Sequence, residues 1–254
     1  MNKIILILII FLWPGMWGSA SGVPPRINHP TMEQTKHFDE VLQFAKAIQW
    51  LGQATVRISY KGHIIYIDPY QLTSAGTADL ILITHDHGDH LSLADVARIA
   101  GPDTRFVVAE ACVDKLQQAG YTNVQSVVPG SKINVLGLDI TAVPAYNITR
   151  QMHPKSKNYV GYIIDFNGIK VYHTGDTERI PEMNGIRCDI IMLPLGQTYT
   201  MNNVEEAVGA VLDTKARIAI PIHWGLYEGS AEDKKKFTEL VNKEKVTVLP
   251  GRNQ

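Results

Sequence analysis

The sequence predicts an α/β domain in which β-sheets are covered by helices. Two observations lead to this class. Short apolar strands bounded by turn residues follow one another from residue 48 onward, and segments with helical periodicity are interspersed among them. In addition, one turn-and-strand unit in the first half of the chain recurs in the second half, which is typical of a domain built from two related halves.

Residues 1–20 have the features of a secretion signal. Lys3 supplies a positive charge, an apolar run extends from Ile4 to Trp13, and Gly18-Ser19-Ala20 offers the small residues that signal peptidase needs. The run is about half of the roughly 20 apolar residues that span a bilayer. We therefore expect export to the periplasm or the medium, with cleavage that leaves no membrane span. An uncleaved N-terminal anchor is the alternative.

Residues 21–48 are predicted to form an N-terminal extension of the main domain, which spans residues 49–254. A proline-rich stretch from Val23 to Pro30 comes first. Apolar side chains then recur at helical spacing between Met32 and Ile48, which predicts an amphipathic helix. We expect this helix to pack on the outside of the domain that follows.

The remaining elements alternate between strands and helices. Short apolar or alternating runs predict strands at residues 55–58, 64–67, 80–83, 106–108, 140–143, 161–165, 170–173, 190–193 and 218–222. Helical patterns predict helices at residues 113–119, 204–212 and 231–244. Ser92 opens one more helix, with Asp95 three residues on as its capping-box partner. Such mixing implies sheets with helices packed on them.

The recurring unit relates the two halves of the chain. The turn and strand from Lys61 to Asp68 are matched by those from Asn167 to Asp176, and each unit ends in an aspartate. Each is followed by a second buried strand, residues 78–83 or 188–193, after which a loop begins. We expect a shared site where the corresponding strand ends meet. Chance similarity between two hydrophobic hairpins is the alternative.

The composition is that of an ordinary globular protein. The net charge is −1, the isoelectric point is about 6.8, and 19% of the residues are charged. No basic excess exists to neutralise phosphates, so a nucleic-acid partner is not expected. A small-molecule substrate is compatible with this composition, and an anionic one needs only a local patch of positive charge.

The segment from Thr84 to His90 is the strongest candidate for chemistry. Three histidines and two aspartates follow a buried strand directly: His85, Asp86, His87, Asp89 and His90. Histidines two apart on an extended segment project to the same side. His85 and His87 can therefore hold one cation while Asp89 and His90 address another. Imidazole and carboxylate ligands suit zinc, with manganese and iron as alternatives.

This segment resembles the His-x-His-x-Asp-His motif of the metallo-β-lactamase superfamily. The similarity continues in order from about Gln49 to Trp224 and is closest to small metal-dependent hydrolases related to ascorbate-phosphate lactonases. The shared segments include Trp50-Leu51-Gly52, Ile67-Asp68-Pro69, Pro144-Ala145-Tyr146-Asn147, His173-Thr174-Gly175-Asp176-Thr177 and Tyr199-Thr200-Met201. The resemblance implies an αββα sandwich of two mixed β-sheets, with the site along one edge of both.

The resemblance also implies a dinuclear metal site. Seven side chains would hold two divalent cations: His85, His87 and His153 the first, Asp89, His90 and His223 the second, and Asp176 both. A hydroxide shared by the cations would attack the substrate. Asp89, His90 and Asp176 are the expected catalytic residues, with Asp89 orienting the nucleophile and passing its proton on.

Two further residues are expected to support the ligands rather than bind metal. By the same resemblance, Asp68 organises the site from the end of a strand. His173 lies close to Asp176 in the sequence and is more typical of a buried supporting residue than of a ligand. Cys112 and Cys188 form no metal motif and are expected to be small buried residues.

Substrate contacts are predicted near the same motifs. Arg150 and Lys155 flank His153 and could recognise a phosphate or carboxylate, although a solvated loop is the simpler interpretation. Tyr146 and Tyr199 adjoin the shared segments and could line the pocket.

The predicted function is hydrolysis of a lactone, ester, amide or phosphoester. One alternative is a β-lactamase proper, although the resemblance is to other branches of the superfamily. Another is a non-catalytic metal-binding module of the same fold. A di-iron redox enzyme is disfavoured by His87, because such members typically carry glutamate at that position.

Overall fold

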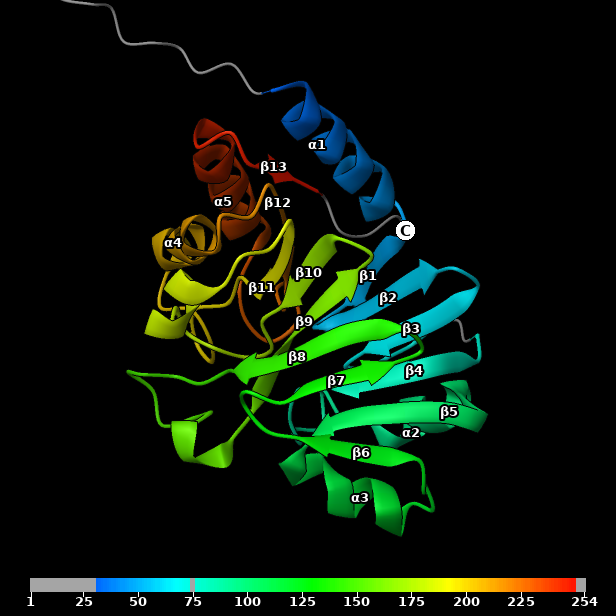
Figure 1. Cartoon of the computed structure of the whole chain (residues 1–254). Helices are drawn as coiled ribbons and strands as arrows, with labels where there is room; N and C mark the ends of the chain where they lie inside the picture. The colour runs from blue at the N-terminus through cyan, green and yellow to red at the C-terminus, as the bar shows by residue number, and fades with distance from the viewer. Residues whose placement is uncertain (1–30, 74–75, 250–254) are drawn as a thin grey trace, which may run out of the picture.

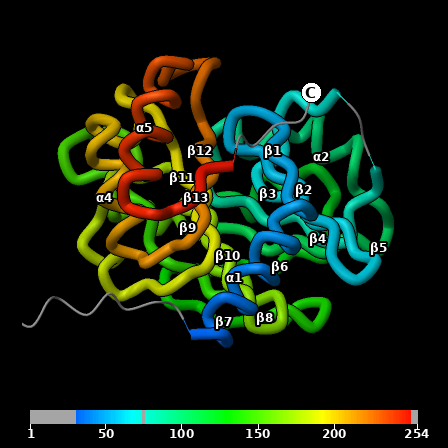
Figure 2. Tube along the Cα trace, turned by 90° about the horizontal axis from the view of Figure 1, so that it is seen from above, coloured from blue at the N-terminus to red at the C-terminus, as the bar shows by residue number. Residues whose placement is uncertain are grey.

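The computed structural model describes residues 31–73 and 76–249, and the predicted signal segment lies outside them. Two β-sheets pack face to face with helices on their outer sides, so the predicted αββα sandwich is confirmed (Figure 1). Seen from above, α4 (Val204–Thr214) and α5 (Ala231–Lys243) lie on one side of the molecule, and α2 (Leu93–Ile99) lies on the other (Figure 2).

The first sheet has six strands in chain order, β1-β2-β3-β4-β5-β6. Their bounds are β1 Ile48–Gly52, β2 Thr55–Tyr60, β3 His63–Ile67, β4 Ala78–Ile83, β5 Ala100–Ala109 and β6 Val124–Val127. Strands β1 to β3 pair antiparallel, and β3 to β6 pair parallel. Strands β1 and β6 were not predicted as separate elements.

The second sheet has seven strands in the order β13-β12-β11-β10-β9-β8-β7. Their bounds are β7 Lys132–Val135, β8 Leu138–Pro144, β9 Val160–Phe166, β10 Ile169–His173, β11 Ile190–Pro194, β12 Ile218–Ile222 and β13 Thr247–Val248. Strands β7 to β10 pair antiparallel, and β10 to β13 pair parallel. Each sheet is thus an antiparallel meander followed by parallel strands, and the recurring sequence unit occupies the same place in both.

The N-terminal helix is shorter than predicted. Helix α1 runs from Met32 to Ala45, and its N-cap Thr31 forms a capping box with Gln34. Ile48, expected inside the helix, is instead the first residue of β1 and pairs with Ile58. Apolar residues on the last helical turn and the first strand residue happen to continue one spacing, so periodicity alone places the end of the helix too late.

The predicted capping box of α2 is half right. Ser92 caps the helix, because its hydroxyl accepts a hydrogen bond from the backbone N–H of Asp95. The Asp95 carboxylate does not accept the backbone N–H of Ser92, as a capping box requires; it accepts the Ser92 hydroxyl at 2.7 Å and the backbone N–H groups of Gln71 and Leu72, both at 2.9 Å. Asp95 therefore ties the loop after β3 to α2.

Strand β11 shows how the layers pack. Ile190 and Met192 lie in the core between the two sheets, whereas Ile191 and Leu193 pack in the cluster that contains Phe237 of α5. Successive strand residues point to opposite faces, so a strand covered on both sides is apolar throughout. Burying each such side chain contributes roughly 1.5–3 kcal/mol.

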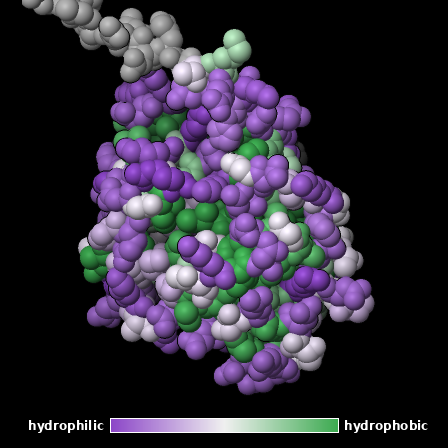
Figure 3. All heavy atoms as spheres, viewed as in Figure 1, coloured by the Kyte–Doolittle hydropathy of each residue, from purple (hydrophilic) through white to green (hydrophobic). Residues whose placement is uncertain are grey.

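Helix α3 (Val113–Gln118) and three short 3₁₀ segments complete the described helical elements; the latter are η1 Glu110–Cys112, η2 Lys155–Lys157 and η3 Pro181–Gly185. Cys112 and Cys188 are buried free thiols, as predicted. Hydrophilic residues cover most of the face seen in Figure 1, with hydrophobic residues gathered toward its middle (Figure 3). No helix within residues 31–73 and 76–249 is long and apolar enough to cross a bilayer.

Candidate metal centre

The candidate ligands, and Asp68 that is expected to support them, lie on loops that follow strands of both sheets. Asp68 directly follows β3, the segment from His85 to His90 begins just after β4, Asp176 comes shortly after β10, and His223 directly follows β12. The carboxyl ends of parallel strands share one edge of a sheet, which is where α/β proteins place their ligands. His153 reaches the same place from the loop between β8 and β9.

Three of these residues have a left-handed backbone. The φ angle is 48° at Asp68, 53° at His153 and 54° at His223. Such a conformation costs a non-glycine residue on the order of 1–3 kcal/mol and is concentrated at functional sites. At Asp68 and His223 it turns the chain immediately after a strand, so that the side chain enters the centre.

The first triad consists of His85, His87 and His153, whose ring nitrogens converge. The Nδ1 atom of His87 lies 3.1 Å from Nε2 of His85 and 3.1 Å from Nε2 of His153. Nitrogens around a tetrahedral zinc at 2.0–2.1 Å lie about 3.3–3.4 Å apart. The spacing of the first triad therefore fits one such cation after a small expansion.

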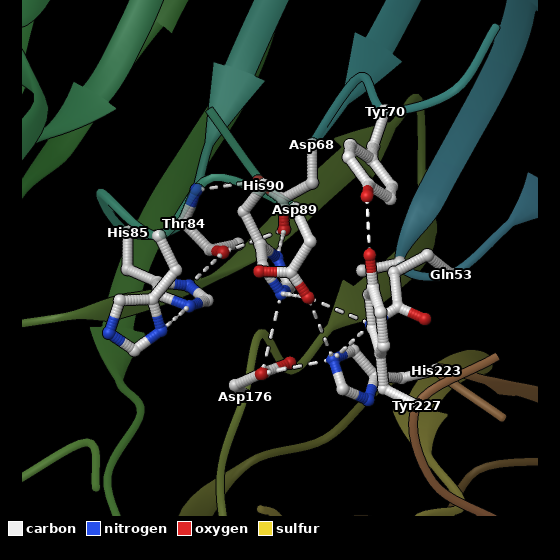
Figure 4. Close-up of polar contacts among 12 residues, drawn as sticks. Gln53, Asp68, Tyr70, Thr84, His85, Asp89, His90, Asp176, His223 and Tyr227 are labelled. Carbon is white, nitrogen blue, oxygen red and sulfur yellow. Dashed lines mark hydrogen bonds and ion pairs between the residues drawn. The ribbon is translucent and has the colours of Figure 1, made fainter. Parts of the chain in front are cut away.

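The second triad consists of Asp89, His90 and His223. Asp89 Oδ2 lies 3.7 Å from Nε2 of His90 and 3.7 Å from Nε2 of His223. Figure 4 shows Asp89 and His90 on one loop and His223 on another, with their side chains pointing toward one another. The His90 Nε2 atom is buried and has no hydrogen-bond partner among the described residues, as expected of a nitrogen reserved for a cation.

Asp176 joins the two triads. Its Oδ2 atom lies 3.1 Å from His223 Nε2 and 3.3 Å from His90 Nε2 in the second triad, and 3.5 Å from His153 Nε2 in the first. Its Oδ1 atom is buried without a hydrogen-bond partner. One carboxylate thus faces ligand atoms of both triads, which is the position of a bridging ligand.

The two triads differ in charge. Burial, followed by repulsion from His90, lowers the pKa of His85 and His87, and burial likewise lowers the pKa of His153. The first triad therefore consists of neutral imidazoles, the form that binds metal. Burial also opposes the charged form of His90, but the carboxylates of Asp176 and Asp68 outweigh it and raise the pKa of His90 to about 10.

His223 behaves in the same way as His90. Burial lowers its pKa, but Asp176, Asp89 and Glu228 together raise it well above the ordinary value. Burial in turn raises the pKa of Asp176, and His223 and His90 outweigh that effect and hold it well below its usual range. The clustered carboxylates therefore stabilise positive charge at the second triad. When no cation is bound, the protons on His90 and His223 provide this charge.

We expect zinc binding to release about two protons at pH 7.5, because a cation must displace the protons of His90 and His223. The apparent affinity of the second triad should rise with pH up to about 10, the pKa of His90. Calorimetric titration in buffers of different ionisation enthalpy measures the protons released. If no protons were released, this charge assignment would be wrong. The first triad serves as the internal control, because its neutral histidines should bind a cation without releasing protons.

Buried carboxylates hold the outer ring nitrogens of the second triad. Asp68 Oδ2 lies 2.8 Å from His90 Nδ1, and Asp68 also accepts hydrogen bonds from the backbone N–H and hydroxyl of Thr84 at 2.8 and 2.6 Å. Glu228 Oε1 lies 2.8 Å from His223 Nδ1. These contacts direct the Nε2 atoms of both histidines into the centre.

Glu228 also fixes the neighbouring loop. Its carboxylate accepts backbone N–H bonds from Thr198 and Tyr199 and the hydroxyl of Thr200. A Cβ atom at Gly196 would lie 1.7 Å from the carboxyl carbon of Glu228, so glycine leaves the room that this buried side chain needs. Glu228 thus connects a metal ligand to the segment that carries Tyr199.

Gln53, in the turn between β1 and β2, reaches into the second triad. Its Nε2 donates to Asp89 Oδ2 at 2.8 Å and lies 2.7 Å from His223 Nε2 (Figure 4). Its backbone oxygen accepts the N–H of His223 at 2.7 Å. Gln53 therefore positions two candidate ligands, of which His223 lies 170 residues away in the sequence and Asp89 lies 36 residues away.

The predicted substrate contacts Arg150 and Lys155 have other partners. Arg150 lies 3.1 Å from the buried carboxylate of Glu178 and donates to the backbone oxygens of Gln197 and Thr200, both at 2.6 Å. Lys155 lies 2.8 Å from Glu182. Neither cation is among the described residues that line the central pocket, so in this structure they brace loops instead of facing a substrate.

The other three predicted residues divide between support and pocket. His173 is buried, with Nε2 3.0 Å from the backbone oxygen of Ala54, and its Nδ1 accepts the N–H of Gly175. Both ring nitrogens are thus occupied outside the centre. The Tyr146 hydroxyl donates to Glu182 at 2.9 Å, away from the pocket. Tyr199 lies on the pocket wall.

We expect Arg150→Gln to lower the free energy of unfolding by about 1.5–3 kcal/mol, because Glu178 loses its charged partner. Zinc affinity of the first triad should fall about 10-fold, since the loop carrying His153 loosens. Urea unfolding and zinc titration measure the two effects. Lys157→Gln, an exposed cation of the same region, serves as the matched control. A selective loss of activity on anionic substrates, at unchanged stability, would instead assign Arg150 to substrate binding.

The centre opens into a cavity of about 630 Å³. Ten residues line it: Tyr70, His87, Gly88, Asp89, Met152, His153, Asp176, Tyr199, His223 and Tyr227. Five of them belong to the triads or bridge them, so the proposed cations would face this cavity. The donor set, the unpartnered buried atoms and the nitrogen spacings together fit a pair of divalent cations.

Comparison with known proteins agrees with this geometry. A family model described as the β-lactamase superfamily domain matches residues 47–223. The chain therefore belongs to the metallo-β-lactamase superfamily. A UPF0173 metal-dependent hydrolase of Methanopyrus kandleri is 31% identical over 228 residues, covering 81% of this chain and 98% of that protein. One of Pyrococcus furiosus is 34% identical over 224 residues, covering 81% and 97%.

A solved structure leads to the same family. A protein of Parabacteroides distasonis described as a metal-dependent hydrolase has a TM-score of 0.71 and 31% identity, over 82% of this chain and 93% of that one. Within the superfamily, the chain thus groups with the UPF0173 metal-dependent hydrolases, and the family predicted from the His-x-His-x-Asp-His motif is confirmed.

Proposed function

We propose that this protein is a dinuclear metal-dependent hydrolase that cleaves a lactone, ester, amide or phosphoester of a small molecule outside the cytoplasm. The observation that carries the proposal is Asp176, whose Oδ2 lies within 3.5 Å of ligand nitrogens in both triads. When bound, two divalent cations supply the Lewis acidity that activates water and stabilises negative charge developing on the substrate.

The chain's own residues perform three tasks around those cations. Asp68 and Glu228 orient the histidines of the second triad, as described above. Gln53 holds the Asp89 carboxylate through Oδ2. Asp89 has a side chain that is 24% exposed and lines the cavity, so it can accept a proton from water there and return it to the leaving group.

Hydrolysis by the purified protein, loaded with zinc or manganese, tests the proposal. The substrate panel contains a phosphodiester, a phosphorylated sugar lactone, a simple ester and a β-lactam. Metal-dependent turnover of one class, absent in His87→Ala, would support it. Elemental analysis should find two cations per chain. If no substrate of the panel were hydrolysed and elemental analysis found one cation or none per chain, the dinuclear assignment would be wrong.

A further inference from the structure

We infer that the substrate carries an uncharged, hydrophobic group that extends from the scissile bond past Tyr70 into a second hollow. This inference rests on the proposed hydrolase function, because the metal centre fixes where the scissile bond lies. It concerns the rest of the substrate, for which the centre itself has no preference.

The wall of the central cavity is neutral outside the metal ligands. Tyr70, Tyr199, Tyr227 and Met152 supply its non-ligand side chains. The Tyr70 and Tyr227 hydroxyls lie 2.5 Å apart, and this hydrogen bond raises the pKa of Tyr227 to about 12, so that the pair stays uncharged. Figure 4 shows the pair beside Gln53 and His223, at one side of the ligand cluster.

A second hollow of about 310 Å³ adjoins the first and shares Tyr70 with it. Its wall combines Trp50, Leu51, Trp224 and Leu226 with the uncharged polar residues Gln53, Gln71 and Thr73, and no charged residue is among the described residues that line it. The Trp50 and Trp224 rings stack with centroids 5.2 Å apart. Flat and aliphatic groups bind such aromatic surfaces by burying apolar area, whereas a carboxylate or phosphate would lose hydration without gaining a cationic partner.

The rim of the cavities is also apolar. Met152, Leu226 and Tyr227 line the two hollows and are 42%, 48% and 50% exposed. Large hydrophobic side chains left exposed together around a pocket mark a binding surface.

Positive charge that could hold an anionic substrate is engaged elsewhere. Arg150 is bound by Glu178, and Lys155 is bound by Glu182. No lysine or arginine is among the described residues lining either hollow. Apart from the cations themselves, no described residue in these walls offers the positive charge that a remote phosphate or carboxylate binds most strongly.

The test compares 4-nitrophenyl esters of acetate, octanoate and succinate on the zinc-loaded full chain. We expect kcat/KM to rise at least about 10-fold from acetate to octanoate, because each buried methylene contributes about 0.8 kcal/mol. The succinate ester should fall below the acetate ester. Equal rates for octanoate and acetate, or preference for succinate, would overturn the inference.

Two variants connect the preference to the second hollow. Leu226→Glu should lower the octanoate-to-acetate ratio about 10-fold, because it places a carboxylate in the apolar wall. Met32→Glu, at a residue 89% exposed at the start of α1, should leave that ratio unchanged. An unchanged ratio in Leu226→Glu would move the hydrophobic group elsewhere and so contradict the inference.

Binding separates this inference from the proposed function. Octanohydroxamate and the hydroxamate of succinate both chelate metal, and calorimetry on the zinc-loaded protein measures their affinities without turnover. Tighter binding of octanohydroxamate by about 10-fold or more would support the inference even if no ester were cleaved. Equal affinity, or tighter binding of the succinate derivative, would overturn it even if the protein proved to be a hydrolase.

Discussion

Replacing Asp176 by alanine is expected to abolish hydrolysis, with kcat/KM falling by about three orders of magnitude or more, equivalent to about 4 kcal/mol of transition-state stabilisation. The reason is that its Oδ2 faces His153 in one triad and both His90 and His223 in the other. Loss of this carboxylate should therefore weaken the binding of both cations. Elemental analysis of the dialysed variant should find less than one cation per chain.

The control for this experiment is Asp103→Ala, at an exposed aspartate in β5. Both variants should retain a cooperative thermal transition, although Asp176→Ala should unfold at a lower temperature, because His90 and His223 lose a buried carboxylate. If Asp176→Ala kept its full metal content and activity, Asp176 would not be a bridging ligand, and the dinuclear assignment would lose its main support. Loss of only one cation would show that Asp176 belongs to a single triad.

Part of the candidate ligand set follows signals of short range in the sequence. The His85–His90 segment is dense in metal-binding side chains directly after a buried strand, and His223 ends another apolar strand. The structure brings all of them, together with Asp176 and His153, to one edge of the two sheets. Strand periodicity predicts that the ends of parallel strands meet, whereas His153 and the bridging place of Asp176 were predicted only from the resemblance to the family.

Three supporting residues, Gln53, Glu178 and Glu228, lacked any such signal. Gln53 meets His223 across 170 residues, and Glu178 meets Arg150 across 28 through loops without periodic pattern. Glu228 could have been suspected only from its place between Gly225 and Gly229, both with positive φ, which mark a tight loop after a ligand. Contacts made by tertiary structure leave no spacing in the chain, so the charge of Arg150 alone could not distinguish substrate recognition from a role on the loop.

The secondary-structure prediction was wrong in places for a different reason. Strand β13 has two residues at the edge of its sheet, too few to establish a period. Ile48 continued the apolar spacing of α1 into β1, where pairing with Ile58 decides its conformation. In both cases the neighbouring strand, and not the local sequence, determines the structure.

The second large effect is expected for Asp68→Ala. This variant leaves the Nδ1–H of His90 and both the N–H and the hydroxyl of Thr84 without their buried acceptor. We expect the free energy of unfolding of the zinc-free protein to fall by about 3–5 kcal/mol, the usual cost of removing one partner from a buried ion pair. Chemical denaturation measures it. Asp79→Ala, which removes a 43% exposed carboxylate that accepts the N–H of Ile64, should cost only about 0.5–1.5 kcal/mol.

Zinc affinity distinguishes orientation from charge in the same variant. Without Asp68, the ring of His90 is no longer held toward the centre, and affinity should fall about 10- to 100-fold. Removing this carboxylate also removes one of the two that raise the pKa of His90 to about 10, so protons compete less with zinc below that pH. The loss of affinity should therefore be largest near pH 10, where wild-type His90 is losing its proton, and smaller at pH 7. A loss that is the same at every pH would mean that Asp68 acts on His90 through geometry alone, and no loss would mean that it does not position this ligand.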